Sequence, residues 1–161
     1  MESDPAAPRL HSGYTLVELT VVITILGVLS ATIGPRFFTQ SVFSERSYAD
    51  ELGGALRATQ KAAVISGCRA RLILAAGSYS AVQQAAAGNA CLTTDITWPT
   101  PVLGAAGDAI ANSAPSGISA APAGVFEFDT QGRLAASPGT TITIGARQIT
   151  IDANTGFVQV Q

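Results

Sequence analysis

The feature that most constrains the fold is an apolar run from Leu16 to Ile33, in which Glu18 is the only charged residue. A helix rises about 1.5 Å per residue, so about 20 residues cross the roughly 30 Å hydrocarbon core of a bilayer. Several residues of the run are β-branched, but inside a bilayer the backbone must satisfy its own hydrogen bonds. We therefore expect a transmembrane helix over residues 14–34. Pro35 should bend or locally melt a continuing helix rather than end it.

The carboxylate of Glu18 separates three interpretations of this run. A secretory signal peptide needs a positively charged start, whereas residues 1–13 carry two acidic residues and one arginine. A plain single-pass anchor gains nothing from an ionisable residue and bears its cost. Both alternatives leave Glu18 unexplained.

A cut between Gly13 and Tyr14 would explain the carboxylate, because it would create an α-amine one helical turn before Glu18. If such helices pack side by side with an axial offset, Glu18 of one can meet the ammonium group of its neighbour. A buried charge is tolerated when it is paired and strongly destabilising when it is not. Glu18 is thus predicted to set the register of assembly.

The stretch "GYTLVEL", residues 13–19, resembles the type III signal of type IV pilins and pseudopilins. The resemblance implies that a prepilin peptidase removes residues 1–13 as a leader and N-methylates Tyr14. Glu18 then matches the glutamate at the family's fifth mature position. Two departures are a tyrosine where phenylalanine is usual and a leader without a clear positive charge.

Residues 35–67 have the pattern of an amphipathic helix. A stripe at steps of three or four residues is expected to pack on a sheet, and a face that contacts a partner protein is the alternative. Gly53 and Gly54 weaken the case for an unbroken helix, since each glycine costs about 1 kcal/mol against alanine. Ser66 and Gly67 are expected to end it. The stripe consists of Tyr48, Leu52, Leu56, Thr59 and Ala63.

Residues 68–161 are predicted to form a β-rich head. Short alternating apolar segments separated by turn residues indicate a small antiparallel sheet of about five to seven strands. Residues 99–124 contain several prolines among Ala, Gly and Ser, and we expect a long surface loop there. The apolar positions are Leu72, Ile73, Leu74, Tyr79, Val82, Phe126, Phe128, Ile142, Ile144, Ile149, Ile151, Phe157 and Val158.

A long N-terminal helix followed by a β head is an α+β arrangement that resembles the pilin fold. The segments "PRFF", "FEFDTQGR" and "ITIDANTGFV" resemble GspH/FimT-type minor pilins and pseudopilins, especially those of mannose-sensitive haemagglutinin (MSHA) type pili. The resemblance implies a single-pass protein of the bacterial inner membrane with a periplasmic head. Its implied partners are other major and minor pilins or pseudopilins, the prepilin peptidase and the inner-membrane assembly platform.

Cys68 and Cys91 are the only cysteines, and the expected topology places both in the periplasm. An even pair in an oxidising compartment indicates a disulfide, and two free buried thiols are the alternative. A catalytic cysteine would need a base, and the only histidine, His11, lies in the predicted leader. We therefore expect no enzyme, no catalytic residue, no cofactor and no metal site.

Charge argues against binding of nucleic acid. Nine basic against eleven acidic residues give a net charge of −2, which provides no general attraction to a polyanion. Arg69 and Arg71 could contact DNA phosphates but more often mark a solvated face. Asp152 with Asn154, and Asp129, could supply oxygen ligands to Ca²⁺ but more often form turns.

The sequence thus predicts a structural subunit, a minor type IV pilin or type II secretion pseudopilin that initiates or primes assembly of a filament. The alternative is a filament-tip module that recognises DNA or a surface ligand, most simply through residues 99–124. The presence of Glu18 favours a position below the extreme tip, because the tip subunit of such filaments often lacks this glutamate.

Overall fold

The computed structural model describes residues 14–37, 40–88 and 90–161. The chain falls into two units, Met1–Thr39 and Gln40–Gln161, which we describe separately. The predicted leader, residues 1–13 with Gly13 and His11, lies outside the described residues.

The described part of the first unit, residues 14–37, consists mainly of the helix α1 (Leu16–Phe37). The helix continues through Gly34 and Pro35, so the proline does not end it. Its large apolar side chains from Tyr14 to Leu29 are between 45% and 83% exposed. Within the described ranges, no helix combines the length and the hydropathy needed to cross a membrane. The transmembrane span expected over residues 14–34 is therefore unconfirmed.

The second unit is built on the helix α2 (Gln40–Ser66), which begins later than the expected residue 35. The predicted stripe of Tyr48, Leu52, Leu56, Thr59 and Ala63 is buried along its whole length, at 0–1% exposure. Gly53 and Gly54 do not interrupt the helix. At its end Gly67 has a φ of +65°, the left-handed conformation that glycine adopts after a last helical turn.

The larger sheet has the order β5-β2-β1-β8-β9, and β6 also pairs with β2. Its central strand β1 forms the predicted hairpin with β2 and pairs antiparallel with β8 on its other side. Phe126 and Phe128 of β8 are fully buried, as their alternation predicts. The strands are β1 (Ala70–Ala75), β2 (Ser78–Gln83), β5 (Thr100–Pro101), β6 (Ala111–Ser113), β8 (Gly124–Phe128) and β9 (Leu134–Ala136).

A second sheet has the order β12-β11-β10-β7, and a short hairpin pairs β3 with β4. The expectation of one sheet is therefore wrong: the head divides its strands between two principal sheets. These strands are β3 (Ala86–Ala87), β4 (Ala90–Cys91), β7 (Ala120–Ala121), β10 (Thr141–Ile144), β11 (Arg147–Ile151) and β12 (Val158–Val160).

Residues 99–124 are not the single surface loop that their composition suggests. Strands β5 and β6 both pair with β2, and β7 pairs with β10, so the segment joins both sheets. Val102 and Ala120 are buried in the core. Short strands of two or three residues carry too little alternation to be recognised in a sequence rich in Ala, Gly and Pro.

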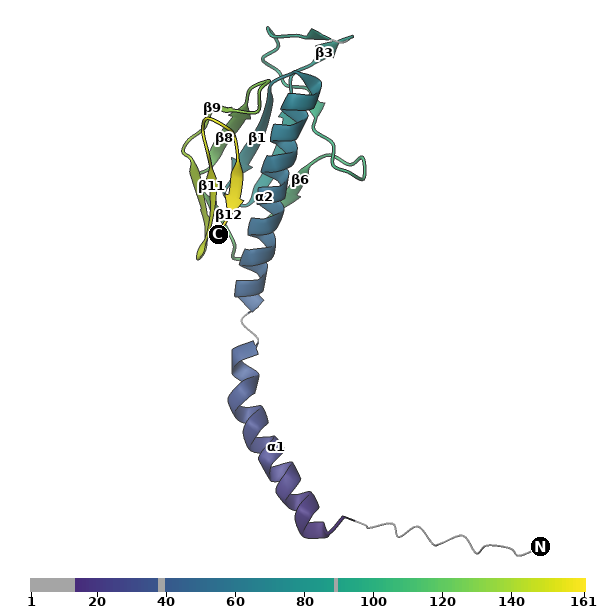
Figure 1. The fold of residues 1–161 in the computed structure, drawn as a ribbon, viewed down its shortest axis with the longest axis vertical. Coiled ribbons are helices and arrows are strands. Elements are labelled where there is room, and N and C mark those ends of the chain that lie inside the picture. Colours follow the sequence, from purple (N-terminus) through teal and green to yellow (C-terminus); the bar gives the residue numbers. More distant parts are fainter. Residues whose placement is uncertain (1–13, 38–39, 89) are drawn as a thin grey trace, which may run out of the picture. The chain divides into compact units, whose positions relative to one another are not determined.

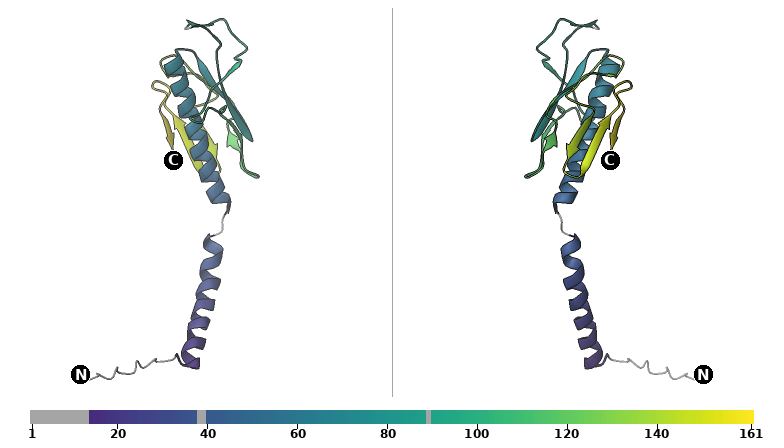
Figure 2. Two further views of the ribbon diagram at one scale, coloured as in Figure 1. Left: turned by 90° about the vertical axis from the view of Figure 1, so that its right-hand side faces the viewer. Right: turned by 90° about the vertical axis from the view of Figure 1, so that its left-hand side faces the viewer.

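The core of the head lies between α2 and the two sheets. Figure 1 shows α2 beside β1, β11 and β12, and Figure 2 shows the same packing from both sides with the C-terminus next to the helix. Ile142, Ile144 and Ile151 are at most 1% exposed. Val158, the first residue of β12, is also buried, whereas Phe157 lies just before that strand and is 63% exposed.

Candidate processing and assembly site

The start of α1 is fixed by Thr15. Its hydroxyl oxygen accepts a hydrogen bond from the backbone N–H of Glu18 at 3.2 Å, and its carbonyl oxygen accepts one from Leu19 at 3.1 Å. Thr15 is therefore the N-cap of the helix, with Glu18 at the third helical position. The spacing Thr-x-x-Glu is that of a capping box. Sequence analysis did not single out Thr15, although this spacing could have revealed its role.

Glu18 lies in the first turn of α1 with an exposed side chain. A carboxylate is favourable there, because the unpaired N–H groups at a helix start carry partial positive charge. Tyr14 lies before the helix and is 83% exposed. Glu18 and Tyr14 thus lie on either side of the helix start, both accessible to another molecule, while Gly13 is outside the described residues.

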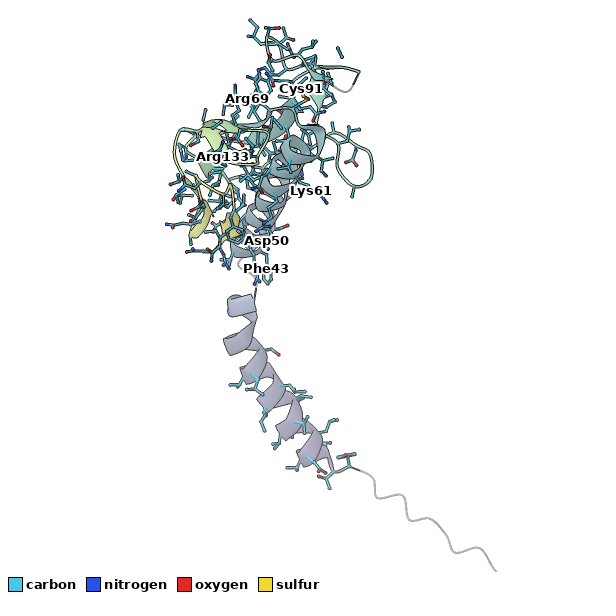
Figure 3. The ribbon with its side chains drawn as sticks, turned by 45° about the horizontal axis from the view of Figure 1, so that its top comes forward. Phe43, Asp50, Lys61, Arg69, Cys91 and Arg133 are labelled. Atoms are coloured by element: carbon cyan, nitrogen blue, oxygen red, sulfur yellow. A yellow bond between two sulfur atoms is a disulfide. The ribbon has the colours of Figure 1, made fainter. Side chains whose placement is uncertain are left out.

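Cys68 and Cys91 form a disulfide with their Cα atoms 5.4 Å apart. The bond joins the segment after α2 to the end of the β3–β4 hairpin. Cys68 is 2% exposed, so its half of the bridge is packed within the head. Figure 3 shows Cys91 and Arg69, the neighbour of Cys68, at the same end of the head.

The chain beyond this hairpin is fastened by Asp95. Its carboxylate accepts hydrogen bonds from the Thr97 hydroxyl at 2.6 Å, the Thr97 N–H at 2.8 Å and the Ala85 N–H at 2.9 Å. These donors stabilise the ionised form and lower the pKa of Asp95 from 3.8 to about 2. Asp95 therefore connects Ala85, which precedes the β3–β4 hairpin, to Thr97, which follows it.

Arg69 and Arg71, considered as DNA contacts, have partners within the head. Arg69 forms an ion pair with Glu127 of β8. The Arg71 guanidinium lies 4.4 Å from the centre of the Trp98 ring, within the range of a cation–π interaction. Both positive charges therefore have structural roles.

Asp129 and Asp152, considered as calcium ligands, stabilise turns. Asp152 accepts from the backbone N–H groups of Asn154 and Thr155 and from the Thr155 hydroxyl. Asp129 accepts from Gln131 and Arg133 in the same manner and pairs with the Arg133 side chain. Across residues 14–37, 40–88 and 90–161, no group of three or more His, Cys, Asp or Glu side chains is placed to hold a metal ion.

A groove lies beside α2. It is lined by Glu51, Gly54, Ala58 and Tyr79 and by residues 108–112, which belong to the segment 99–124 that was expected to be a loop. One carboxylate oxygen of Glu51 accepts from both the Tyr79 hydroxyl and the Asn112 amide. Burial first, and then the bond to Glu51, raises the pKa of Tyr79. The groove also includes Asp108, so it carries negative charge.

Comparison with known proteins identifies the N-terminal segment. Residues 8–34 match the family described as the prokaryotic N-terminal methylation motif. The match covers the start of α1, with Tyr14, Thr15 and Glu18, and supports a type IV pilin-like protein. No curated protein and no solved structure gives a significant match.

Proposed function

We propose that this chain is a minor type IV pilin or type II secretion pseudopilin, a structural subunit that initiates or primes a filament after processing by a prepilin peptidase. The observation that carries the proposal is the methylation motif over residues 8–34, with Glu18 in the first turn of an exposed apolar helix. The subtype is proposed from the scattered likeness of short head segments to GspH/FimT-type subunits of MSHA-type pili.

Processing would prepare the N-terminus for assembly. Hydrolysis breaks the bond between the Gly13 carbonyl carbon and the Tyr14 nitrogen, leaving a carboxylate on the leader and an ammonium group on Tyr14. When a second subunit packs alongside with an offset, the exposed Glu18 pairs with that ammonium group. Only the paired register avoids an isolated charge among apolar helices, so the pair selects the register.

The apolar side chains of α1 supply the driving force for this step. Burying them against lipid or against neighbouring helices stabilises by about 25 cal/mol per Å². We propose that α1 anchors the subunit in the inner membrane before assembly and lies in the filament core afterwards. The head, folded around its own helix α2, would remain in the periplasm and contact other pilins or pseudopilins.

Intact mass spectrometry of the protein from its native membrane tests the proposal. We expect a mass that begins at Tyr14 with one added methyl group, and two hydrogens fewer before reduction than after it. An uncut chain, or a mass that begins downstream of α1, would end the filament proposal.

A filament-tip module that recognises DNA has less support. Arg69 and Arg71 are engaged within the head, and the groove beside residues 108–112 carries carboxylates that would repel phosphate.

A further inference from the structure

We propose that the outer face of the second sheet is a binding site for an uncharged oligosaccharide, centred on a hollow next to Phe157. The hollow has a volume of about 500 Å³, and a range of about 300–1,000 Å³ is typical of small-molecule sites. Such a site goes beyond the structural role proposed above and does not depend on processing of the N-terminus. The side chains of the hollow that matter here are those of Thr140, Thr150, Asp152, Asn154, Phe157 and Gln159.

Two of these residues, Thr150 and Gln159, belong to a sheet face that carries uncharged polar side chains. In β10, β11 and β12 buried residues alternate with more exposed ones, so one face packs on the core and the other points outward. The register aligns Thr141 with Thr150 and Thr150 with Gln159, one side chain from each strand. Thr143 and Gln148 lie opposite each other on the same outward face. The face therefore presents hydroxyl and amide groups in rows, with the strands about 4.8 Å apart.

The turn between β11 and β12 supplies further lining residues and is held by its own hydrogen bonds. Asp152 accepts from the backbone N–H groups of Asn154 and Thr155, and its own N–H donates to the Phe157 carbonyl oxygen at 2.9 Å. The Phe157 N–H donates to the Thr155 hydroxyl at 3.2 Å. The backbone of Phe157 is thus fixed, while its side chain is 63% exposed. A preformed site of this kind avoids the cost of ordering a loop when a ligand binds.

This combination of groups fits a carbohydrate better than other ligands. Hydroxyl and amide side chains both donate and accept hydrogen bonds, as sugar hydroxyls do. The C–H groups on one face of a sugar ring can pack on the electron-rich face of Phe157. A nucleic acid would need positive charge, whereas the described residues that line the hollow include one charged side chain, the acidic Asp152. A protein partner would need a larger apolar centre than one ring provides.

A ligand-observed NMR titration of the full-length protein in zwitterionic lipid nanodiscs tests the site, because nanodiscs avoid detergents with sugar headgroups. The probes are cellohexaose and chitohexaose, two uncharged hexasaccharides whose extended chains can place successive rings over successive strands. Hexagalacturonate is the anionic comparison. We expect a dissociation constant below about 1 mM for at least one uncharged probe and weaker binding of hexagalacturonate. If neither uncharged probe binds, or if hexagalacturonate binds as tightly, the proposal is wrong.

Variants then place the binding on this face. Phe157→Leu keeps an apolar side chain but loses the aromatic face, and Thr150→Val keeps the β-branched shape but loses the hydroxyl. We expect each to weaken binding about fivefold, and Phe157→Tyr to bind as the unaltered protein does. Phe43→Leu is the matched control, because Phe43 is 70% exposed on α2 and does not line the hollow.

Unchanged binding by Phe157→Leu or by Thr150→Val would overturn the proposal, and so would equal weakening by Phe43→Leu. None of these results would bear on the processing and assembly of the subunit. Failure of this inference is therefore distinguishable from failure of the proposed function.

Discussion

Gly53 of α2 lies directly against Val160 of β12: a Cβ atom on Gly53 would be 2.5 Å from Val160 Cγ2. Real Cβ atoms do not approach so closely, so only glycine allows this packing. One turn later, Arg57 donates two hydrogen bonds to the Val158 carbonyl oxygen, at 3.2 and 3.1 Å. The last strand is therefore held on the helix by a close approach and by a charged donor.

Gly53→Ala and Gly54→Ala should have opposite effects on the free energy of unfolding of the head. A Cβ on Gly54 has no other atom within 4 Å, so Gly54→Ala should stabilise by about 0.5–1 kcal/mol through helix propensity. Gly53→Ala gains the same propensity but must displace Val160, and we expect a net loss of about 1 kcal/mol. Urea unfolding followed by the fluorescence of Trp98 measures both, and equal stabilisation by the two changes would contradict the close packing.

Removing the disulfide should destabilise the head. Cys68 and Cys91 are separated by 23 positions, and a loop of this size corresponds to about 3 kcal/mol in the chain-entropy model. We expect Cys68→Ser/Cys91→Ser to lower the free energy of unfolding by that amount. Reduced unaltered protein is the control and should match the double variant. Equal stability of oxidised and reduced protein would mean that the bridge constrains nothing.

Acid should loosen the segment that Asp95 fastens. The pKa of this carboxyl is lowered from 3.8 to about 2, chiefly by the Thr97 hydroxyl. A lowered folded-state pKa means that the stabilisation is complete above pH 3.8 and is lost as the pH falls through about 2. Relative to an unstructured amide at the same pH, the Ala85 and Thr97 amides should therefore exchange faster as the pH falls across this interval. Asp95→Asn should abolish the pH dependence, and its persistence in that variant would assign it to another group.

Glu18→Ala should separate anchoring from assembly. The variant keeps every apolar side chain of α1 and should remain membrane-associated and processed. It loses the carboxylate that pairs with a neighbour's ammonium group, so we expect its amount in sheared filaments to fall about tenfold or more, as for a buried ion pair that loses one partner. Thr20→Ala is a suitable control, because it alters the same helix without changing its charge. Normal incorporation of Glu18→Ala would contradict the register proposal.

The parts of the fold that could be predicted are those with strong local periodicity. A few residues are enough to predict the buried face of such an element. Examples are the α2 stripe with Leu52 and Leu56 and the alternating pairs Ile142/Ile144 and Ile149/Ile151. Residues 99–124 could not be assigned, because their short strands are defined by the strands they join and not by their own pattern.

The candidate site divides in the same way. Tyr14 and Glu18 belong to a contiguous motif that a reader of the sequence can recognise, and Thr15 was within reach through its spacing to Glu18. The stacking of Arg71 on Trp98 was not, because only the folded topology brings these distant residues together. Because of this contact, Arg71, which the sequence presents as a candidate for a basic surface, stabilises the head instead.

The Cys68–Cys91 bridge also has a mechanical consequence. Strands β1 and β2 lie entirely within the loop that it closes. Force applied to the two ends of the chain therefore passes through the disulfide and cannot extend these strands. Fully extended, a chain of that length would release roughly 75 Å, at about 3.4 Å per residue. If the head is pulled from its ends, segments outside residues 68–91 would unfold and extend first. The central strand β1 of the larger sheet would be among the last parts of this fold to extend.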